Sequence, residues 1–261
     1  MVDLRQLHPS LLPLDGGINF RDLGGNRAAD GRRIRQGKLF RSGSLDLLSE
    51  ADCRHLAGVP VADVVDYRDP DEAAARPDIL WSGARYHAVP ANPLRHEVTA
   101  NLESLSAEQL AAFDARAFML ELYRRLPFDN AAYRQLASLL RQPSQGALVQ
   151  HCAVGKDRTG IGSALVLFAL GADEQTVLED YLLTQTTLAP FRQQLLTQLS
   201  ATLNDKALRQ FDWVLSVQEV FLMTALREIR ARYDSIDNWL TVEYGLDSEA
   251  RAGLQARYLL A

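Results

Sequence analysis

The alternation of apolar and polar positions predicts an α/β protein. Short apolar runs bounded by glycine, proline or charged residues are typical of strands, and longer segments with apolar residues three and four apart are typical of helices. Strands are predicted for the runs around 18–25, 38–43, 61–66, 85–90 and 147–150. Because helical segments alternate with these runs, we expect a central, mostly parallel β-sheet flanked by helices.

The segment from Leu94 to Arg125 predicts a helical insertion between two strands. Ser106 and Gln109 have the spacing of a capping box, in which each side chain bonds the other's backbone N–H. The apolar residues that follow recur at spacings of 3, 4 and 3, which predicts one amphipathic helix: Leu110, Phe113, Ala117 and Leu120. A second helix is predicted over about 130–140.

From Ile161 to Ala261 the pattern is almost entirely helical. Gly171 is suited to end the first of these helices, and Asp173 to cap the next. A row of apolar residues favours one long helix over about 208–233: Leu215, Leu222, Leu226, Ile229 and Tyr233. Residues 1–261 contain no internal repeat, low-complexity segment or linker, so we expect a single domain with a helical insertion at about 94–126 and a large helical C-terminal region.

Composition and charge exclude several classes of protein. With 28 basic and 33 acidic residues, the formal net charge of −5 argues against nucleic acid as a partner. Two cysteines imply no disulfide framework; Cys53 lies in a predicted helix, and the other is Cys152. Early charges argue against a signal peptide, and no apolar run reaches the length of a membrane span. We expect a soluble, cytoplasmic protein without stable membrane insertion, although export by a specialised machinery stays open.

The candidate chemistry lies in the segment 151–160, His-Cys-Ala-Val-Gly-Lys-Asp-Arg-Thr-Gly, between a predicted strand and a predicted helix. Backbone N–H groups at a helix N-terminus have no partner within the helix, and the helix dipole adds positive charge there. Such a loop binds anions. A cysteine at its mouth has its thiolate stabilised, and the thiolate is the nucleophilic form.

Each residue of this segment suits phosphoryl chemistry. Arg158 follows Cys152 by six positions, so a curled loop brings its planar guanidinium to the same phosphate. Lys156 supplies a second cation, and Thr159 can donate its hydroxyl to the sulfur. His151 can orient the loop through backbone carbonyls. The remaining candidates are expected to bind substrate through their backbone N–H groups or to allow the tight curvature of the loop: Ala153, Val154, Gly155 and Gly160.

His-Cys-x5-Arg-Thr-Gly resembles the signature of the cysteine-dependent protein tyrosine phosphatases. The full segment is similar to a bacterial branch that acts on phosphotyrosine, sometimes on other phosphoproteins and phosphoinositides. A second string, Asn-Phe-Arg-Asp-Leu-Gly-Gly at 19–25, resembles the N-terminal signature of the same branch. In that branch a helical pair after the loop helix can cover the pocket as a lid. Carried over, this predicts a lid at about 184–204, with ordinary core packing as the alternative.

Charged residues near two other strands are further candidates. In the resembled family a strand ending Asp-x-Arg lies beside the active site, and Asp66 and Arg68 match that motif here. The alternative interpretation is that the two residues only form a salt bridge at the end of the strand. Arg21 and Asp22 are interpreted either as a local ion pair at a turn or as residues near the active site.

The resemblance implies hydrolysis through a phosphocysteine. Cys152 attacks phosphorus while the loop amides and Arg158 hold the phosphoryl oxygens, and water then cleaves the intermediate. A phenolate leaves better when an acid protonates it, so an aspartate is expected. The segment after Tyr86, where many phosphatases carry that acid, has none before Glu97. Asp157 is therefore the first candidate, because its place is fixed by the motif, and Asp66 is the second.

The substrate and the reaction class leave alternatives. Phosphotyrosine in a protein or peptide is the expected substrate, and Lys156 beside Arg158 also suits phosphoinositides, which carry more than one phosphate. A phosphate-binding module without turnover and sulfur transfer of the rhodanese kind are hypotheses from other classes. The five histidines form no ligand-spaced set, so we expect neither a metal nor another cofactor.

Overall fold

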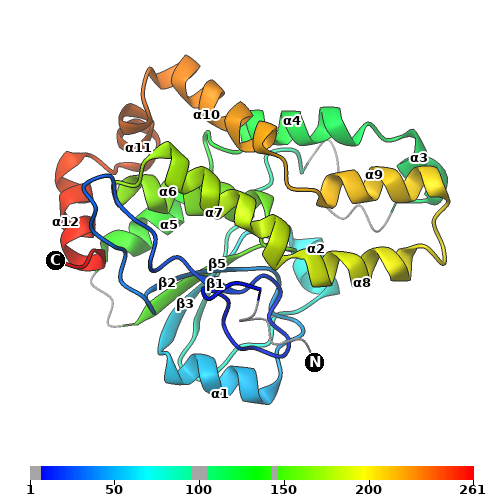
Figure 1. The fold of residues 1–261 in the computed structure, drawn as a ribbon, viewed down its shortest axis with the longest axis horizontal. Coiled ribbons are helices and arrows are strands. Elements are labelled where there is room, and N and C mark those ends of the chain that lie inside the picture. The colour runs from blue at the N-terminus through cyan, green and yellow to red at the C-terminus, as the bar shows by residue number, and fades with distance from the viewer. Residues whose placement is uncertain (1–6, 96–104, 143–145) are drawn as a thin grey trace.

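The structure is a computed structural model that describes residues 7–95, 105–142 and 146–261. In this part of the chain five strands form one sheet in the order β1-β2-β5-β3-β4, with helices on both faces (Figure 1). The strands are β1 (Arg21–Asp22), β2 (Leu39–Ser42), β3 (Val61–Asp66), β4 (Arg85–Ala88) and β5 (Ala147–His151). Only β1 runs antiparallel to its neighbour. The predicted α/β class with a mostly parallel sheet is confirmed.

Strand β5 is the centre of the sheet and is buried along its whole length. Val149 points to a core that includes Leu56 of α1 (Glu50–Gly58), while Leu148 points to the larger core on the opposite face. Successive side chains of a strand point to opposite faces, so β5 contributes to both cores. Parallel β2 and β3 flank it on either side. The chain that leaves β5 therefore emerges at the middle of the sheet edge where parallel strands end.

The larger core lies between the sheet and the C-terminal helices, with α6 (Asp157–Ala169) at its centre. Helix α6 is apolar on all sides and almost entirely buried, as expected for a helix surrounded by protein. The other helices between and after the strands are α2 (Pro70–Ala75), α3 (Ala107–Ala112), α4 (Ala115–Arg125), α5 (Ala131–Arg141), α7 (Glu174–Thr187), α8 (Ala189–Leu199), α9 (Asp205–Leu215), α10 (Glu219–Tyr233), α11 (Ile236–Tyr244) and α12 (Ser248–Tyr258).

The single amphipathic helix predicted to follow Ser106 is wrong, because the segment forms two helices, α3 and α4. The Ser106 capping box is present, but α3 ends before Phe113, whose backbone is extended. Asp114 then caps α4 by accepting a hydrogen bond from the backbone N–H of Ala117. A short carboxylate that bonds nearby backbone N–H groups competes with a continuous helix, and here it starts a new one.

The long helix predicted over 208–233 is also wrong, since α9 ends at Leu215 and α10 begins at Glu219. The Nζ of Lys156 donates hydrogen bonds to the carbonyl oxygens of Val214 and Ser216, at 2.5 and 2.9 Å. In an uninterrupted helix these oxygens would accept bonds from residues 218 and 220. A tertiary contact therefore replaces the helical bonds at this point.

Helices α3, α8 and α9 form an extension of the molecule that we call the cap (Figure 1). It has a small core of its own, formed by Leu110, Ala207, Phe211 and Leu215. Helix α8 has no fully buried residue, which fits a thin outer layer. The expected insertion at 94–126 contains α3 and α4, with 96–104 outside the described residues, and the expected lid at 184–204 contains α8.

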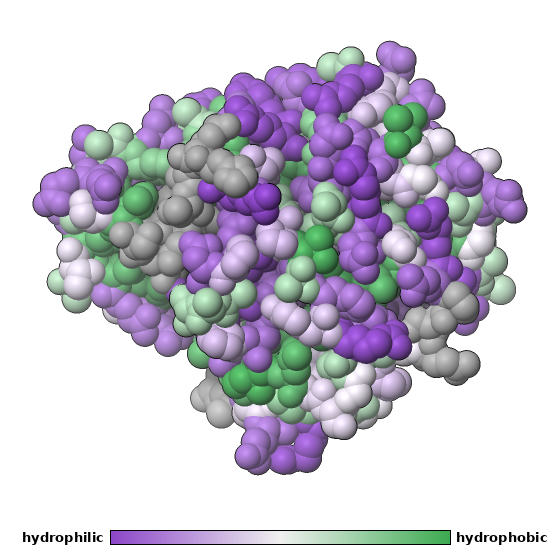
Figure 2. Space-filling model, turned by 180° about the vertical axis from the view of Figure 1, so that it is seen from behind, coloured by the Kyte–Doolittle hydropathy of each residue, from purple (hydrophilic) through white to green (hydrophobic). Residues whose placement is uncertain are grey.

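The surface seen from behind is mostly hydrophilic, with separate apolar patches (Figure 2). Among the large apolar residues that the structure describes, Val242 has the highest exposed fraction, 67%. None of the helices in the described part of the chain has the length and apolar character needed to cross a bilayer.

Candidate active site

The segment that joins β5 to α6 and includes the first helical turn, Cys152–Arg158, is called the phosphate loop below. It connects a strand end to a helix N-terminus, as predicted. Gly155 has a φ of +70°, a conformation that favours glycine. A Cβ there would lie 2.5 Å from the carbonyl carbon and oxygen of Ser42. The loop thus passes so close to β2 that only glycine fits at this position.

Cys152 lies at the base of the loop and is 2% exposed. The Thr159 hydroxyl, in the first turn of α6, is buried and has no hydrogen-bond partner among the described residues. The hydrogen bond from this hydroxyl to the Cys152 sulfur, which the sequence predicts, is therefore not formed in this structure. The carbonyl of Ala153 accepts a 3.0 Å bond from the N–H of Ser44, which holds the loop against the segment after β2.

Arg158 forms a bidentate ion pair with Glu72 of α2, at 2.5 and 2.9 Å. Burial acts to raise the pKa of Glu72, but the charge and hydrogen bonds of Arg158 and the backbone N–H of Asp69 together outweigh it, and the pKa lies below its usual value. The Tyr133 hydroxyl also donates to the Arg158 carbonyl, at 2.7 Å. Glu72 was missed at the sequence level. Its signal was the string beginning at Asp69, Asp-Pro-Asp-Glu, whose first and last residues form a capping box.

Lys156 points to the cap rather than to solvent, and its side chain is 1% exposed. Besides the carbonyls of Val214 and Ser216, its ammonium lies 3.0 Å from Asp157 Oδ1. Two of the three donor hydrogens of the ammonium are thus bonded to backbone carbonyls, and its charge is paired with that of Asp157. The neighbouring Val154 packs against the cap core. The loop and the cap are therefore joined by both a polar and an apolar contact.

Asp157 begins α6 and is partly accessible, with 16% of its side chain exposed. Its Oδ1 accepts a 2.7 Å hydrogen bond from the Tyr123 hydroxyl, which itself lies 2.8 Å from the Tyr181 hydroxyl. Gly160, one helical turn further, faces the ring of Tyr181, which a Cβ would approach to 3.2 Å.

Asp66 and Arg68 pair with each other at the end of β3, and both side chains are 1% exposed. The Arg68 Nε and one terminal nitrogen bond the Asp66 carboxylate, and the Tyr86 hydroxyl donates to the same group at 2.5 Å. Burial acts to raise the pKa of Asp66, but His151, Arg68 and Tyr86 outweigh it and lower it to about 2. This geometry is that of a salt-bridged strand end.

His151 lies between the carboxylates of Asp66 and Asp78. Its Nε2 is 3.1 Å from Asp78, and its Nδ1 is 3.7 Å from Asp66 and 3.4 Å from the Cys152 carbonyl oxygen. Within the described ranges, these three side chains are the group whose spacing suits a metal ion. The Arg68 guanidinium already bridges the two carboxylates, at 2.8 and 2.7 Å, and supplies the positive charge there.

The N-terminal string 19–25 meets the phosphate loop through a buried cluster. Arg21 pairs with Asp180 of α7, and so does Arg41 of β2. The Arg41 guanidinium and the Asn19 amide both donate to the Gly155 carbonyl oxygen, at 2.9 and 3.0 Å. Burial and the charge of Arg41 lower the pKa of Arg21 to about 9 despite its pairing with Asp180.

The local ion pair between Arg21 and Asp22 is not formed. Asp22 instead accepts hydrogen bonds from the backbone N–H groups of Gly24 and Gly37, at 2.7 and 2.6 Å. Arg41 and Asp180 were missed at the sequence level. Neither lies in a motif, and only the packing of β2 against α7 brings them together.

A sequence profile of the tyrosine phosphatase family matches residues 12–260, nearly the whole chain. The chain belongs to the tyrosine phosphatase family. A Cupriavidus necator protein named as a tyrosine-protein phosphatase is 35% identical over 252 residues, 95% of this chain and 88% of that protein. The family resemblance stated from the phosphate loop and the N-terminal string is confirmed, and with it the enzyme class.

Two further proteins share less sequence identity with this tyrosine phosphatase. The triple specificity protein phosphatase PtpB of Mycobacterium tuberculosis is 29% identical over 256 residues, 87% of this chain and 91% of PtpB. The crystal structure of P. aeruginosa TpbA matches 74% of this chain and 89% of TpbA, with 18% identity and a TM-score of 0.29.

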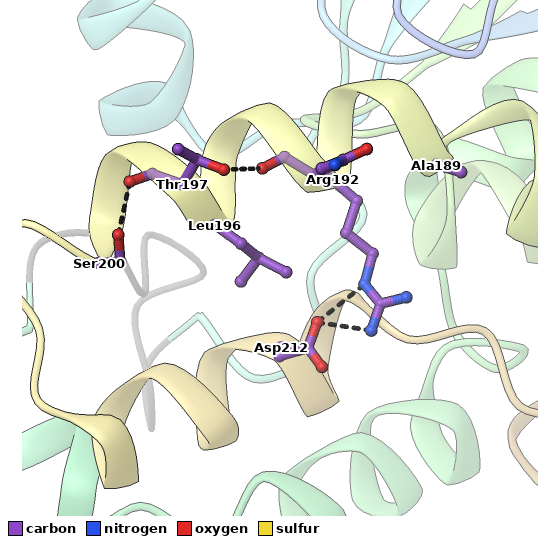
Figure 3. Close-up of a pocket in the computed structure, with 7 residues that line it drawn as sticks. Ala189, Arg192, Leu196, Thr197, Ser200 and Asp212 are labelled. Carbon is purple, nitrogen blue, oxygen red and sulfur yellow. Dashed lines mark hydrogen bonds and ion pairs between the residues drawn. The ribbon is translucent and has the colours of Figure 1, made fainter.

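The tyrosine phosphatase also has a cavity of about 580 Å³ between α8 and α9 (Figure 3). Arg192 and Asp212 form an ion pair across it, at 2.5 Å. The other residues that line it are Ala189, Gln193, Leu196, Thr197 and Ser200. None of them belongs to the phosphate loop, so this cavity lies within the cap, apart from the loop.

Proposed function

We propose that this tyrosine phosphatase hydrolyses phosphotyrosine in proteins through a phosphocysteine intermediate. The observation behind the proposal is the phosphate loop, in which Cys152 lies just before the N-terminus of α6. Arg158 follows six positions later, and Glu72 holds its guanidinium by two hydrogen bonds. Preorganised amides and a guanidinium stabilise the charge of a phosphoryl group in transit. The family match over residues 12–260 supports the same reaction.

In the first step the Cys152 thiolate attacks phosphorus, so that an S–P bond forms and the bond from phosphorus to the phenolic oxygen breaks. The loop N–H groups and Arg158 hold the remaining phosphoryl oxygens. In the second step water attacks phosphorus, the S–P bond breaks, and phosphate and the thiolate are released. Thr159 is assigned to donate to the sulfur as the thiolate departs, because a hydroxyl donor stabilises a departing thiolate and the Thr159 hydroxyl has no other hydrogen-bond partner among the described residues.

Proton transfer is assigned to Asp157 rather than to Asp66. Asp66 is enclosed by Arg68 and Tyr86 and has a pKa of about 2, so it holds a proton poorly near neutral pH. Asp157 belongs to the loop and is partly exposed. It gives a proton to the leaving phenolate and receives one from the attacking water. Arg68 and His151 are assigned to holding the strand end beneath the loop.

Phosphotyrosine is favoured over phosphoinositides by the contacts of Lys156. The second cation that a doubly phosphorylated headgroup would need already donates to the carbonyls of Val214 and Ser216 and is paired with Asp157. A broader substrate range remains the second candidate, because a relative at 29% identity is named a triple specificity phosphatase. Binding without turnover is the candidate from another class.

The test compares the purified protein with its Cys152→Ser variant. Turnover is measured with a phosphotyrosyl peptide, a soluble phosphoinositide and a generic aryl phosphate, with and without a chelator. We expect Cys152→Ser to lower turnover by about 10³-fold or more, since loss of a nucleophile removes the covalent route. Rapid acid quench of a radiolabelled substrate should trap phosphate on the wild-type enzyme alone. Turnover that survives in Cys152→Ser would reject the mechanism.

A further inference from the structure

We propose that the Tyr123 hydroxyl, backed by that of Tyr181, is a positioning group that fixes which oxygen of Asp157 carries the transferred proton. The proposal rests on the role assigned to Asp157 above. Neither tyrosine belongs to a sequence motif: Tyr123 lies in α4, within the helical insertion, and Tyr181 lies in α7. Both reach the phosphate loop only through the packing of the helices.

The two contacts of Asp157 fall on the same oxygen. The Tyr123 hydroxyl donates to Oδ1 at 2.7 Å, and the ammonium of Lys156 lies 3.0 Å from Oδ1. The other oxygen, Oδ2, accepts no hydrogen bond from any residue in the described ranges. The bond donated by Tyr123 and the nearby ammonium charge both disfavour a proton on Oδ1, so a protonated Asp157 carries its proton on Oδ2.

The direction of the hydroxyl chain is fixed by counting protons. A tyrosine hydroxyl has a single proton, and Tyr123 uses it toward Asp157. The 2.8 Å contact between the two hydroxyls must therefore be a bond donated by Tyr181 to Tyr123. Burial first, and the nearby Asp157 charge second, raise the pKa of both tyrosines well above the usual value. Both stay protonated, and the chain donates toward Asp157 in either state of the carboxyl group.

The rings are held so that the hydroxyl has little freedom. Tyr123 is fully buried, stacks on Phe221 of α10 with ring centroids 5.6 Å apart, and meets Tyr181 edge-on at 6.1 Å. Three helices thus set the direction of one O–H bond. Replacement of Tyr123 by phenylalanine removes a single oxygen atom and leaves these ring contacts in place.

A positioned proton matters most when the leaving group is poor. Phenyl phosphate needs a proton as its oxygen departs, whereas 4-nitrophenyl phosphate has a leaving group that departs without one. We expect Tyr123→Phe to lower kcat/KM, which reports the step that releases the phenolate, by about tenfold for phenyl phosphate, a part of the 10²–10⁴ available from general acid catalysis. Its kcat/KM for 4-nitrophenyl phosphate should change by less than about twofold.

Two further variants separate positioning from packing. Tyr181→Phe should show the same dependence on the leaving group with a smaller loss. Tyr244→Phe removes another buried hydroxyl, one that donates to the Pro127 carbonyl at 2.6 Å, and should keep full activity. Thermal unfolding of each variant shows whether it folds as the wild type does.

A double-mutant cycle completes the test. In an Asp157→Asn background, Tyr123→Phe should cause no further loss, because its target no longer transfers a proton. Equal losses with both aryl phosphates, or the same loss in the Asp157→Asn background, would overturn the proposal. If Asp157→Asn loses the same factor of activity with phenyl phosphate as with 4-nitrophenyl phosphate, the role of Asp157 and this proposal both fail. Hydrolysis through Cys152, tested separately by Cys152→Ser, would still stand.

Discussion

The Arg41 guanidinium donates a 2.9 Å hydrogen bond to the carbonyl oxygen of Gly155. The two residues come close because Arg41 of β2 pairs in register with Gln150 of the parallel strand β5, and the phosphate loop follows the end of β5. With its other terminal nitrogen, Arg41 pairs with Asp180 of α7 at 2.5 Å. The phosphate loop is therefore fixed from the side opposite to Glu72, and α7 shares that contact.

Arg41→Met should destabilise the protein by about 3 kcal/mol, because it removes one partner of a buried charged cluster. It should also weaken phosphate binding, since the Gly155 carbonyl loses one of its two side-chain donors. Urea unfolding and inhibition by inorganic phosphate measure the two effects. Arg54→Met removes an exposed arginine of α1 and serves as the control, with no change expected. Equal behaviour of the two variants would contradict this role of Arg41.

Gly155→Ala should abolish most activity. The new Cβ would add the strain of a positive φ, about 1–3 kcal/mol, to a clash with the backbone of Ser42. Gly31→Ala is a matched control, because Gly31 also has a positive φ, +89°, and its Cβ would meet no atom within 4 Å. Both variants should lose stability, and Gly155→Ala alone should lose turnover. Measurement of kcat and of the unfolding midpoint for each variant separates strain from loop displacement.

Glu72→Gln should lower kcat/KM by about tenfold while leaving α2 intact. Glutamine keeps the length of the side chain and can serve in the capping box that Glu72 forms with the Asp69 backbone. It removes the negative charge that holds the Arg158 guanidinium by two hydrogen bonds. The expected loss should appear as weaker inhibition by orthovanadate as well as slower turnover. Unchanged vanadate inhibition would show that Arg158 needs no such partner.

Acid should remove a part of the stability that Asp66 provides. Its pKa is about 2 in the folded protein and about 3.9 when unfolded, so its contribution is present above pH 4. The unfolded state binds its proton first as the pH falls, and the contribution, about 2 kcal/mol, is lost by pH 2. Unfolding free energies between pH 5 and 2 should fall less steeply in Asp66→Asn. Parallel curves for the two proteins would place the acid sensitivity elsewhere.

Local signals were sufficient for much of the fold. The runs around Leu39 and Val64 gave strands at the expected places, because short apolar runs bounded by charged residues or glycine are typical of strands. The predictions failed at Asp114 and Ser216, where two helices stand in place of one. At Ser216 the cause is the Lys156 ammonium, which lies 60 positions earlier in the chain and carries no local signal there.

The sequence by itself located the proposed nucleophile, since Cys152, Gly155 and Arg158 lie within one short loop and their order is that of a phosphate-binding loop. It also determined the family, through that loop and the string at 19–25. Only the tertiary structure decided which side chains support the loop, because Glu72, Asp180 and Tyr123 arrive on separate helices. A buried charge or hydroxyl needs a hydrogen-bond partner because water cannot reach it, and the packing of the helices determines which residue that partner is.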